Sequence, residues 1–140
     1  MRRMFMRFFG LVVFCASLSA CKTASDPLLA NAPTDPVAFR QFLLKTMPDV
    51  LHETTCTCCN KKLDQCYRET VAHAAGACPD SCTTCLFEGR VALALKKRGV
   101  SDAEVARRTE AIARGEEKPP GDIQVEIDPG SEAHGHPHPH

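Results

Sequence analysis

Apolar side chains in the middle of the chain recur every three or four residues, a pattern that predicts helices. The first helix is expected to begin at Thr34-Asp35-Pro36, where a polar cap precedes a proline suited to the first helical turn. Its apolar face holds Phe39, Phe42, Leu43 and Met47. Pro48 interrupts this pattern, and residues 48–52 are expected to add one short turn of helix.

A second helix is predicted over residues 61–75, with Gly76 as its stop and His73 near its end. Leu63, Cys66, Tyr67, Thr70 and Ala74 lie near one face of it. A third helix is predicted from a cap at Asp80 or Ser81 to Arg98, and Gly99 ends it. Its interior face carries Cys82, Cys85, Leu86, Gly89 and Leu93, at spacings of three and four.

A fourth helix is predicted over residues 102–114, opened by a capping box of Ser101 and Glu104 and closed by Gly115. The chain has no Trp, one Tyr and 6% aromatic residues, so apolar burial alone gives a thin core. The sequence therefore predicts an all-α fold, a small bundle of three to four short helices stapled by a cysteine cluster.

The first residues have the features of an export signal. Residues 1–7 carry three Arg and no acid, and the apolar run Phe8–Leu18 is too short to span a membrane comfortably. Leu18-Ser19-Ala20-Cys21 resembles the bacterial lipobox, in which the cysteine is acylated and becomes the mature N-terminus. Residues 1–20 are thus expected to be a lipoprotein signal peptide, with Cys21 anchored to the membrane through fatty-acyl chains such as palmitate.

Two features of this signal bear on localisation. Lys22, rather than Asp, follows the cysteine, which by resemblance favours the outer membrane of the bacterial envelope, with the domain facing the periplasm. Arg2-Arg3 is similar to the twin-arginine pattern, whose export route carries folded proteins, whereas a basic start of this kind also suits the general secretory route. Both routes stay open at this point.

The charge is unevenly distributed along the chain. The formal net charge is zero, but removal of residues 1–20 takes away three Arg and leaves −3. Residues 116–140 carry −5, and residues 22–115 carry +2. We expect a lipidated tether over residues 21–34, a cysteine-rich helical domain over 35–115 and an acidic, His-rich, disordered tail over 116–140. The neutral balance argues against binding to nucleic acid.

The cysteine count changes once processing is considered. The chain has nine Cys; Cys15 leaves with the signal peptide and Cys21 is lipidated. Seven remain in the mature domain: Cys56, Cys58, Cys59, Cys66, Cys78, Cys82 and Cys85. An odd number cannot pair completely within one chain, so a simple disulfide framework does not close.

The spacing of these cysteines suggests a metal site. Cys56 and Cys59 form one C-x-x-C pair and Cys82 and Cys85 another, and four thiolates suit tetrahedral zinc. Crowded soft sulfur also suits Cu(I), and Cys58, Cys66 and Cys78 would extend the site or pair. Two alternatives stay open: a thiol–disulfide oxidoreductase that uses Cys82 and Cys85 at a helix start, and an interaction module stapled by disulfides.

The order of these elements resembles a family of cysteine-rich bacterial lipoproteins named for a P-C-Y-C-G-C motif. Cys56-Thr57-Cys58-Cys59 stands for the triple-cysteine loop of that family, Cys66-Tyr67 for its next element and Cys82-x-x-Cys85 for its last. The loop here lacks the Pro and Gly of the motif, and Cys78 is additional. The resemblance covers about residues 40–112 and implies a lipoprotein with a cysteine site, without a settled activity.

Six histidines are weaker candidate ligands. His134, His136, His138 and His140 alternate along the tail near several carboxylates and could collect Zn, Cu(II) or Ni weakly. His52 precedes the cysteine loop, and His73 is expected on the second helix. No Ser-His-Asp order, phosphate loop or carboxylate pair stands out, so binding or trafficking of zinc or copper is the leading hypothesis, ahead of an enzymatic function. The protein partner is unknown.

Overall fold

A computed structural model describes residues 27–123. Its elements are η1 (Pro27–Leu29), α1 (Pro36–Thr46), α2 (Pro48–Glu53), α3 (Leu63–Val71), α4 (Thr83–Lys97) and α5 (Asp102–Ala113). Within these residues the only β pairing is an isolated bridge between Thr55 and Lys62. The predicted all-α fold is therefore confirmed. The expected signal peptide, Cys21 and the tail histidines lie outside the described residues.

The first two helices begin where the sequence places them. The Asp35 carboxylate caps α1 by accepting a hydrogen bond of 2.8 Å from the backbone N–H of Ala38, and Pro36 occupies the first turn. The second proline, Pro48, opens α2 directly after Met47, which caps the end of α1. The expected short turn of helix after Pro48 is thus present as α2.

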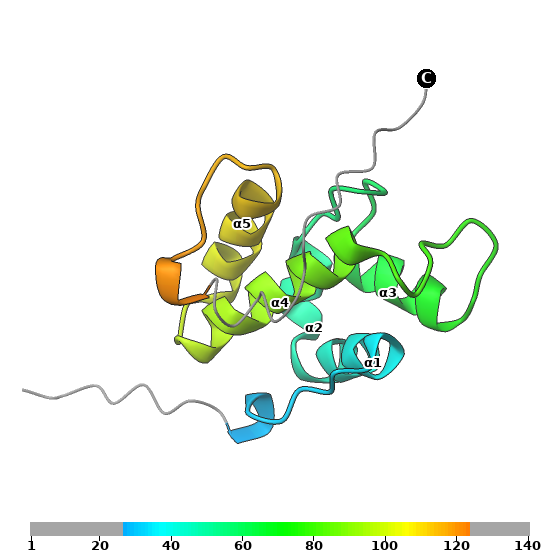
Figure 1. The fold of residues 1–140 in the computed structure, drawn as a ribbon, viewed down its shortest axis with the longest axis horizontal. Coiled ribbons are helices and arrows are strands. Elements are labelled where there is room, and N and C mark those ends of the chain that lie inside the picture. The colour runs from blue at the N-terminus through cyan, green and yellow to red at the C-terminus, as the bar shows by residue number, and fades with distance from the viewer. Residues whose placement is uncertain (1–26, 124–140) are drawn as a thin grey trace, which may run out of the picture.

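Helix α4 runs through the middle of the fold and packs against α5 on one side and α1 on another (Figure 1). Gly89 permits the close approach of its neighbours. A Cβ atom at this position would lie 2.8 Å from Cδ1 of Leu43 and would collide with the Tyr67 hydroxyl. Because no larger side chain fits, Gly89 lets α1 and α3 pack closely against α4.

The predicted helix ends are partly correct. Gly99 and Gly115 adopt positive φ angles of 75° and 74° directly after α4 and α5, as expected of helix stops. The second predicted helix is too long, because α3 ends at Val71 and His73 lies beyond it with φ 50°. Ser101 occupies the N-cap position of α5, but its side chain makes no capping hydrogen bond, so the predicted capping box is wrong in that respect.

The packed part of the chain extends past the predicted domain boundary at residue 115. Ile123 is fully buried in the hydrophobic core, and Asp122 forms an ion pair of 2.7 Å with Arg98. Burial of Ile123 and ion pairs from Asp122 and Glu117 together hold this polar, proline-rich segment against the domain. Among residues 27–123, no helix has the length and apolar character needed to cross a membrane.

Candidate metal centre

All seven cysteines of the described region are free thiols, and the fold brings them to one place. They come from the loop before α3, from α3 itself, from the segment that leads into α4 and from the first turn of α4. Their sulfur atoms form two groups, within each of which all sulfurs lie within 4.8 Å of one another. The first group, here called group A, is Cys58, Cys78, Cys82 and Cys85; the second, group B, is Cys56, Cys59 and Cys66.

The loop over residues 55–62 is shaped by its own backbone. The N–H of Cys56 donates to the carbonyl of Lys61 at 2.8 Å, and the N–H of Asn60 donates back to the carbonyl of Cys56 at 2.9 Å. Asn60 has φ 55°, a left-handed conformation that asparagine tolerates better than most residues. This tight turn presents three cysteines within four residues.

Two carboxylates on other helices fix this loop. Oε1 of Glu88, on α4, accepts hydrogen bonds from the backbone N–H of Thr57 at 2.7 Å and from its hydroxyl at 2.6 Å. Oε1 of Glu110, on α5, accepts from the N–H of Thr55 at 2.6 Å. Charge-assisted bonds to backbone N–H groups are among the stronger hydrogen bonds in proteins, so the loop is held at both sides.

Arg40 positions the segment between α3 and α4. This fully buried side chain donates from Nη1 to the carbonyl of Asp80 at 2.8 Å and from Nη2 to that of Pro79 at 3.4 Å. Its guanidinium also lies 5.7 Å from the ring centroid of Tyr67. The Tyr67 hydroxyl in turn donates to the carbonyl of Cys85 at 2.6 Å. These contacts place Cys78 and Cys82 relative to α4.

Three thiols lie near helix N-termini. Cys82 is the N-cap residue of α4, Cys85 lies in its first turn, and Cys66 is the fourth residue of α3. The unpaired N–H groups and the dipole of a helix N-terminus attract negative charge, so these positions suit side chains that hold an anionic ligand set.

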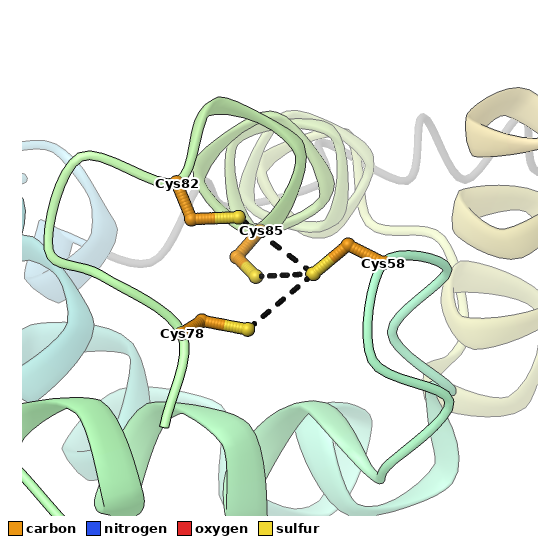
Figure 2. Close-up of side chains that lie close together, drawn as sticks. All are labelled: Cys58, Cys78, Cys82 and Cys85. Atoms are coloured by element: carbon orange, nitrogen blue, oxygen red, sulfur yellow. Dashed lines mark hydrogen bonds between the residues drawn. The ribbon is translucent and has the colours of Figure 1, made fainter. Parts of the chain in front are cut away.

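The sulfur atoms are in mutual contact. Figure 2 shows Sγ of Cys58 facing those of Cys85, Cys78 and Cys82, at distances of 3.2, 3.5 and 3.6 Å. Sγ of Cys85 also lies 3.4 Å from that of Cys56 and 3.5 Å from that of Cys66, so this one sulfur contacts both groups. Cys56, Cys66 and Cys85 are buried, whereas Cys58 is exposed.

The inner thiols influence each other's protonation. Hydrogen bonds from the thiols of Cys66 and Cys85 hold the pKa of Cys56 well below its usual range. The same hydrogen bonds to Cys56 raise the pKa values of Cys66 and Cys85, which keep their protons as donors. Even without a metal, the centre therefore favours a thiolate at Cys56 surrounded by neutral thiols, so one negatively charged ligand is already present.

Glu88 is a buried carboxyl beside this centre. Burial raises its pKa to about 7, against the opposing effect of the hydrogen bonds from Thr57, and the negative charge of Cys56 raises it further. Its second oxygen, Oε2, has no hydrogen-bond partner among the described residues. A polar group of this kind next to ligands is typical of the surroundings that orient metal-binding side chains.

The donor set fits a soft metal ion. Zinc–sulfur bonds of about 2.3 Å in a tetrahedron separate the sulfurs by about 3.8 Å, and the Cys58 sulfur lies 3.2, 3.5 and 3.6 Å from those of Cys85, Cys78 and Cys82, close to that spacing. A disulfide, by contrast, joins two sulfurs at about 2.05 Å and satisfies cysteines only in pairs. Seven sulfurs gathered in one cluster suit metal coordination better than a set of disulfide bonds.

The structure divides the predicted ligands differently from their spacing in the sequence. Cys56 and Cys59 lie in group B, whereas Cys82 and Cys85 lie in group A, so the two C-x-x-C pairs do not form one four-sulfur set. Among the described residues, His52 and His73 join neither group. His52 is exposed and lies 3.3 Å from Asp64, and His73 is exposed in the turn after α3.

Sequence reasoning missed the residues that support the centre. Arg40 and Glu88 are fully buried. The sequence pattern does not predict this, because a single charged residue among apolar ones on a helix is usually a surface residue. The available signal was the apolar character of the segment around Glu88, where α4 is buried on most sides.

No family model matches the chain, and no curated protein and no solved structure gives a significant match to it. The geometry of the centre therefore carries the functional argument alone.

Proposed function

We propose that this protein is a lipid-anchored protein of the bacterial envelope that binds zinc or copper through its seven thiols, for storage or transfer of the ion. The observation that carries this proposal is the convergence of all seven cysteines in one partly buried cluster, with no disulfide among residues 27–123. Soft thiolate ligands select zinc and Cu(I) over hard cations. The exposed Cys58 gives an ion, or a partner that delivers one, access to the cluster.

The envelope location rests on the sequence. The lipobox-like Leu18-Ser19-Ala20-Cys21 supports a membrane anchor at Cys21, and Lys22 supports the outer membrane. The resemblance to the P-C-Y-C-G-C lipoproteins supports the same assignment. In this proposal, the tail histidines His134, His136, His138 and His140 act as a weak secondary collector of ions near the membrane-tethered domain.

The anchor is tested by Cys21→Ser. We expect this variant to lose labelling with palmitate and to leave the membrane fraction, because a serine cannot accept the thioether-linked lipid. Cys15→Ser, in the expected signal peptide, serves as the control and should be labelled normally. Equal labelling of Cys21→Ser and the unsubstituted protein would exclude this anchor.

The metal-binding proposal is tested by native mass spectrometry of the mature protein, before and after alkylation of its thiols. The unsubstituted protein is expected to carry metal, and Cys82→Ser is expected to carry less of it. Thr83→Ser, an exposed neighbour in the same turn, is the matched control and should keep its metal. A protein with six oxidised cysteines and no metal would contradict the proposal.

The redox alternative predicts a different result in the same experiment. An oxidoreductase that uses Cys82 and Cys85 would carry no metal and would exchange with glutathione disulfide, with Cys82 as the accessible thiol. Cys85 is fully buried, and its sulfur contacts the sulfurs of Cys56, Cys58 and Cys66. These surroundings favour a role for Cys85 as a metal ligand over a role as a thiol that exchanges with disulfides.

A further inference from the structure

We infer that the seven thiols hold two four-coordinate zinc ions that share the thiolate of Cys85. The inference rests on the proposed metal-binding function and specifies its stoichiometry. Two tetrahedral sites need eight sulfur contacts, and seven sulfurs supply them when one sulfur bridges. The odd number of cysteines, which defeats a disulfide framework, is the number that such a bridged pair requires.

The partition of the sulfurs supports two sites. Group A has the four sulfurs of a complete tetrahedron, whereas group B has three and is one ligand short. Within residues 27–123 neither a histidine nor a carboxylate joins group B, so Glu88, whose Oε2 has no hydrogen-bond partner, does not belong to that set. The missing fourth ligand of group B is therefore sought among the sulfurs of group A.

Cys85 is the sulfur placed to bridge. It lies 3.4 Å from Cys56 and 3.5 Å from Cys66, two of the three members of group B, and 3.2 Å from Cys58 in group A. The other sulfur of group A with a contact to group B is that of Cys58, which lies 3.5 Å from Cys56. Cys58 is also exposed, whereas Cys85 is fully buried between the groups.

Helix α4 helps to hold a bridging sulfur in place. Cys85 lies in the first turn of α4, and its carbonyl accepts the hydrogen bond from the Tyr67 hydroxyl. Gly89, one turn later, allows Tyr67 to reach this position. The backbone at Cys85 is thus fixed from two sides before any ion binds.

The balance of the binding step follows from this arrangement. Starting from seven thiols, seven S–H bonds break and seven protons pass to solvent, while eight Zn–S bonds form. The two ions bring four positive charges to seven thiolates, so the loaded centre carries a net charge of −3. No oxidant or reductant takes part. Cu(I), which accepts two or three thiolates, would give a different and higher number of ions per chain.

Stoichiometry and connectivity test the inference separately. The reduced, full-length mature protein is titrated with Zn²⁺ without oxygen and weighed by native mass spectrometry, with two zinc ions per chain expected. The protein is then loaded with Cd²⁺, a zinc substitute visible by NMR. The β-protons of Cys85 are expected to couple to two cadmium signals, and those of each other cysteine to one.

Variants sharpen the assignment. Cys78→Ser, confined to group A, and Cys59→Ser, confined to group B, should each keep one zinc ion. Cys85→Ser should weaken both sites by about 100-fold or more, since loss of an outer partner alone costs about 10- to 100-fold in affinity. Where the Cys85→Ser variant fails to fold, the cadmium coupling pattern of the unsubstituted protein decides.

The outcomes separate this inference from the function on which it rests. One zinc ion per chain, a bridging cysteine other than Cys85, or three or more Cu(I) ions with fewer than two zinc ions would overturn the bridged pair and leave metal binding intact. Absence of any bound zinc, cadmium or copper under reducing conditions would overturn both.

Discussion

The two ends of helix α4 are stabilised by different means. Its N-terminal end meets the seven thiols and the loop over residues 55–62, and its contacts there are polar or sulfur-based. Its C-terminal end packs Val91 and Leu95 with Val105 and Ile112 of α5 into an apolar core. We call these the thiol region and the apolar region. Apolar burial stabilises the apolar region, and in the proposed function a bound metal ion completes the thiol region.

This difference has a consequence for folding. In the thiol region Oε2 of Glu88 is buried without a hydrogen-bond partner among the described residues, and a buried polar group of this kind is costly. The apolar region contains one such atom, Oγ1 of Thr109 on α5, which a metal ion held by the thiols would not satisfy. Metal binding should therefore act as local folding energy for one part of the domain and leave the other nearly unchanged.

Removal of the metal should have the largest effect. In the reduced protein treated with a chelator, backbone amides of the thiol region are expected to lose most of their protection from hydrogen exchange, while those of the second half of α4 and of α5 keep theirs. Hydrogen exchange resolved by mass spectrometry measures both at once. Equal loss of protection in the two regions would remove the distinction between them.

Acidification should act in the same direction. Thiols are protonated at a pH below their pKa, and the pKa values of Cys66 and Cys85 are raised. As the pH falls, protons therefore compete more strongly with the metal ion for the sulfurs. Metal affinity should fall as the pH is lowered from 8 to about 5, which a chromophoric chelator measures by competition. An affinity that does not change over this range would show that thiolates are not the ligands.

Gly89→Ala should destabilise the domain by about 2–3 kcal/mol, the usual range for overpacking a tight core. The new methyl group meets Leu43 and the Tyr67 hydroxyl, and displacement of Tyr67 releases its bond to Cys85. Urea denaturation measures the loss, with Gly121→Ala as control, because nothing lies within 4 Å of a Cβ atom there. A variant as stable as the control would show that α4 can move away at no cost.

Glu88→Ala should cost about 2 kcal/mol, because it removes the two hydrogen bonds that the N–H and hydroxyl of Thr57 donate to a carboxylate. Glu88→Gln keeps an acceptor oxygen and should cost less. The metal-loaded forms of both variants are compared by urea denaturation. If alanine and glutamine are equally harmful, the charge of Glu88 matters more than its hydrogen bonds to the loop.

The smallest effect is expected from the surface of the apolar region. Arg107 pairs with Glu104 at 2.7 Å on the exposed face of α5, where solvent screens such pairs. Arg107→Ala should leave both the denaturation midpoint and the metal affinity unchanged. A marked loss of metal binding in this variant would connect the two regions in a way that their packing does not suggest.

The sequence predicts the two regions unequally well. The start of α1 at Asp35-Pro36 and the stops at Gly99 and Gly115 follow from local chemistry, and local chemistry is visible in a short window. The end of α3 is not visible in a short window, because it depends on the left-handed conformation of His73 in the turn toward Cys78. The spacing of apolar residues does not predict this turn.

The candidate site was predictable as a list of residues and not as an arrangement. The seven cysteines follow from counting, but the predicted helix start is wrong, because Cys82 caps α4, in place of Asp80 or Ser81, and only Cys85 lies within the helix. The division into groups A and B depends on how α3 and α4 meet, which brings Cys66 to Cys85. Arg40 and Glu88 make long-range contacts of the same kind, which no local pattern contains.

The central claim is that cysteines alone are the ligands of the metal centre, apart from any ions that the tail histidines collect weakly. X-ray absorption at the metal edge of the mature protein, purified from membranes without oxygen, tests it most directly. The account predicts a shell of sulfur atoms alone, at about 2.3 Å for zinc. A shell that contains nitrogen or oxygen ligands, or a protein with no metal and oxidised cysteines, would contradict it.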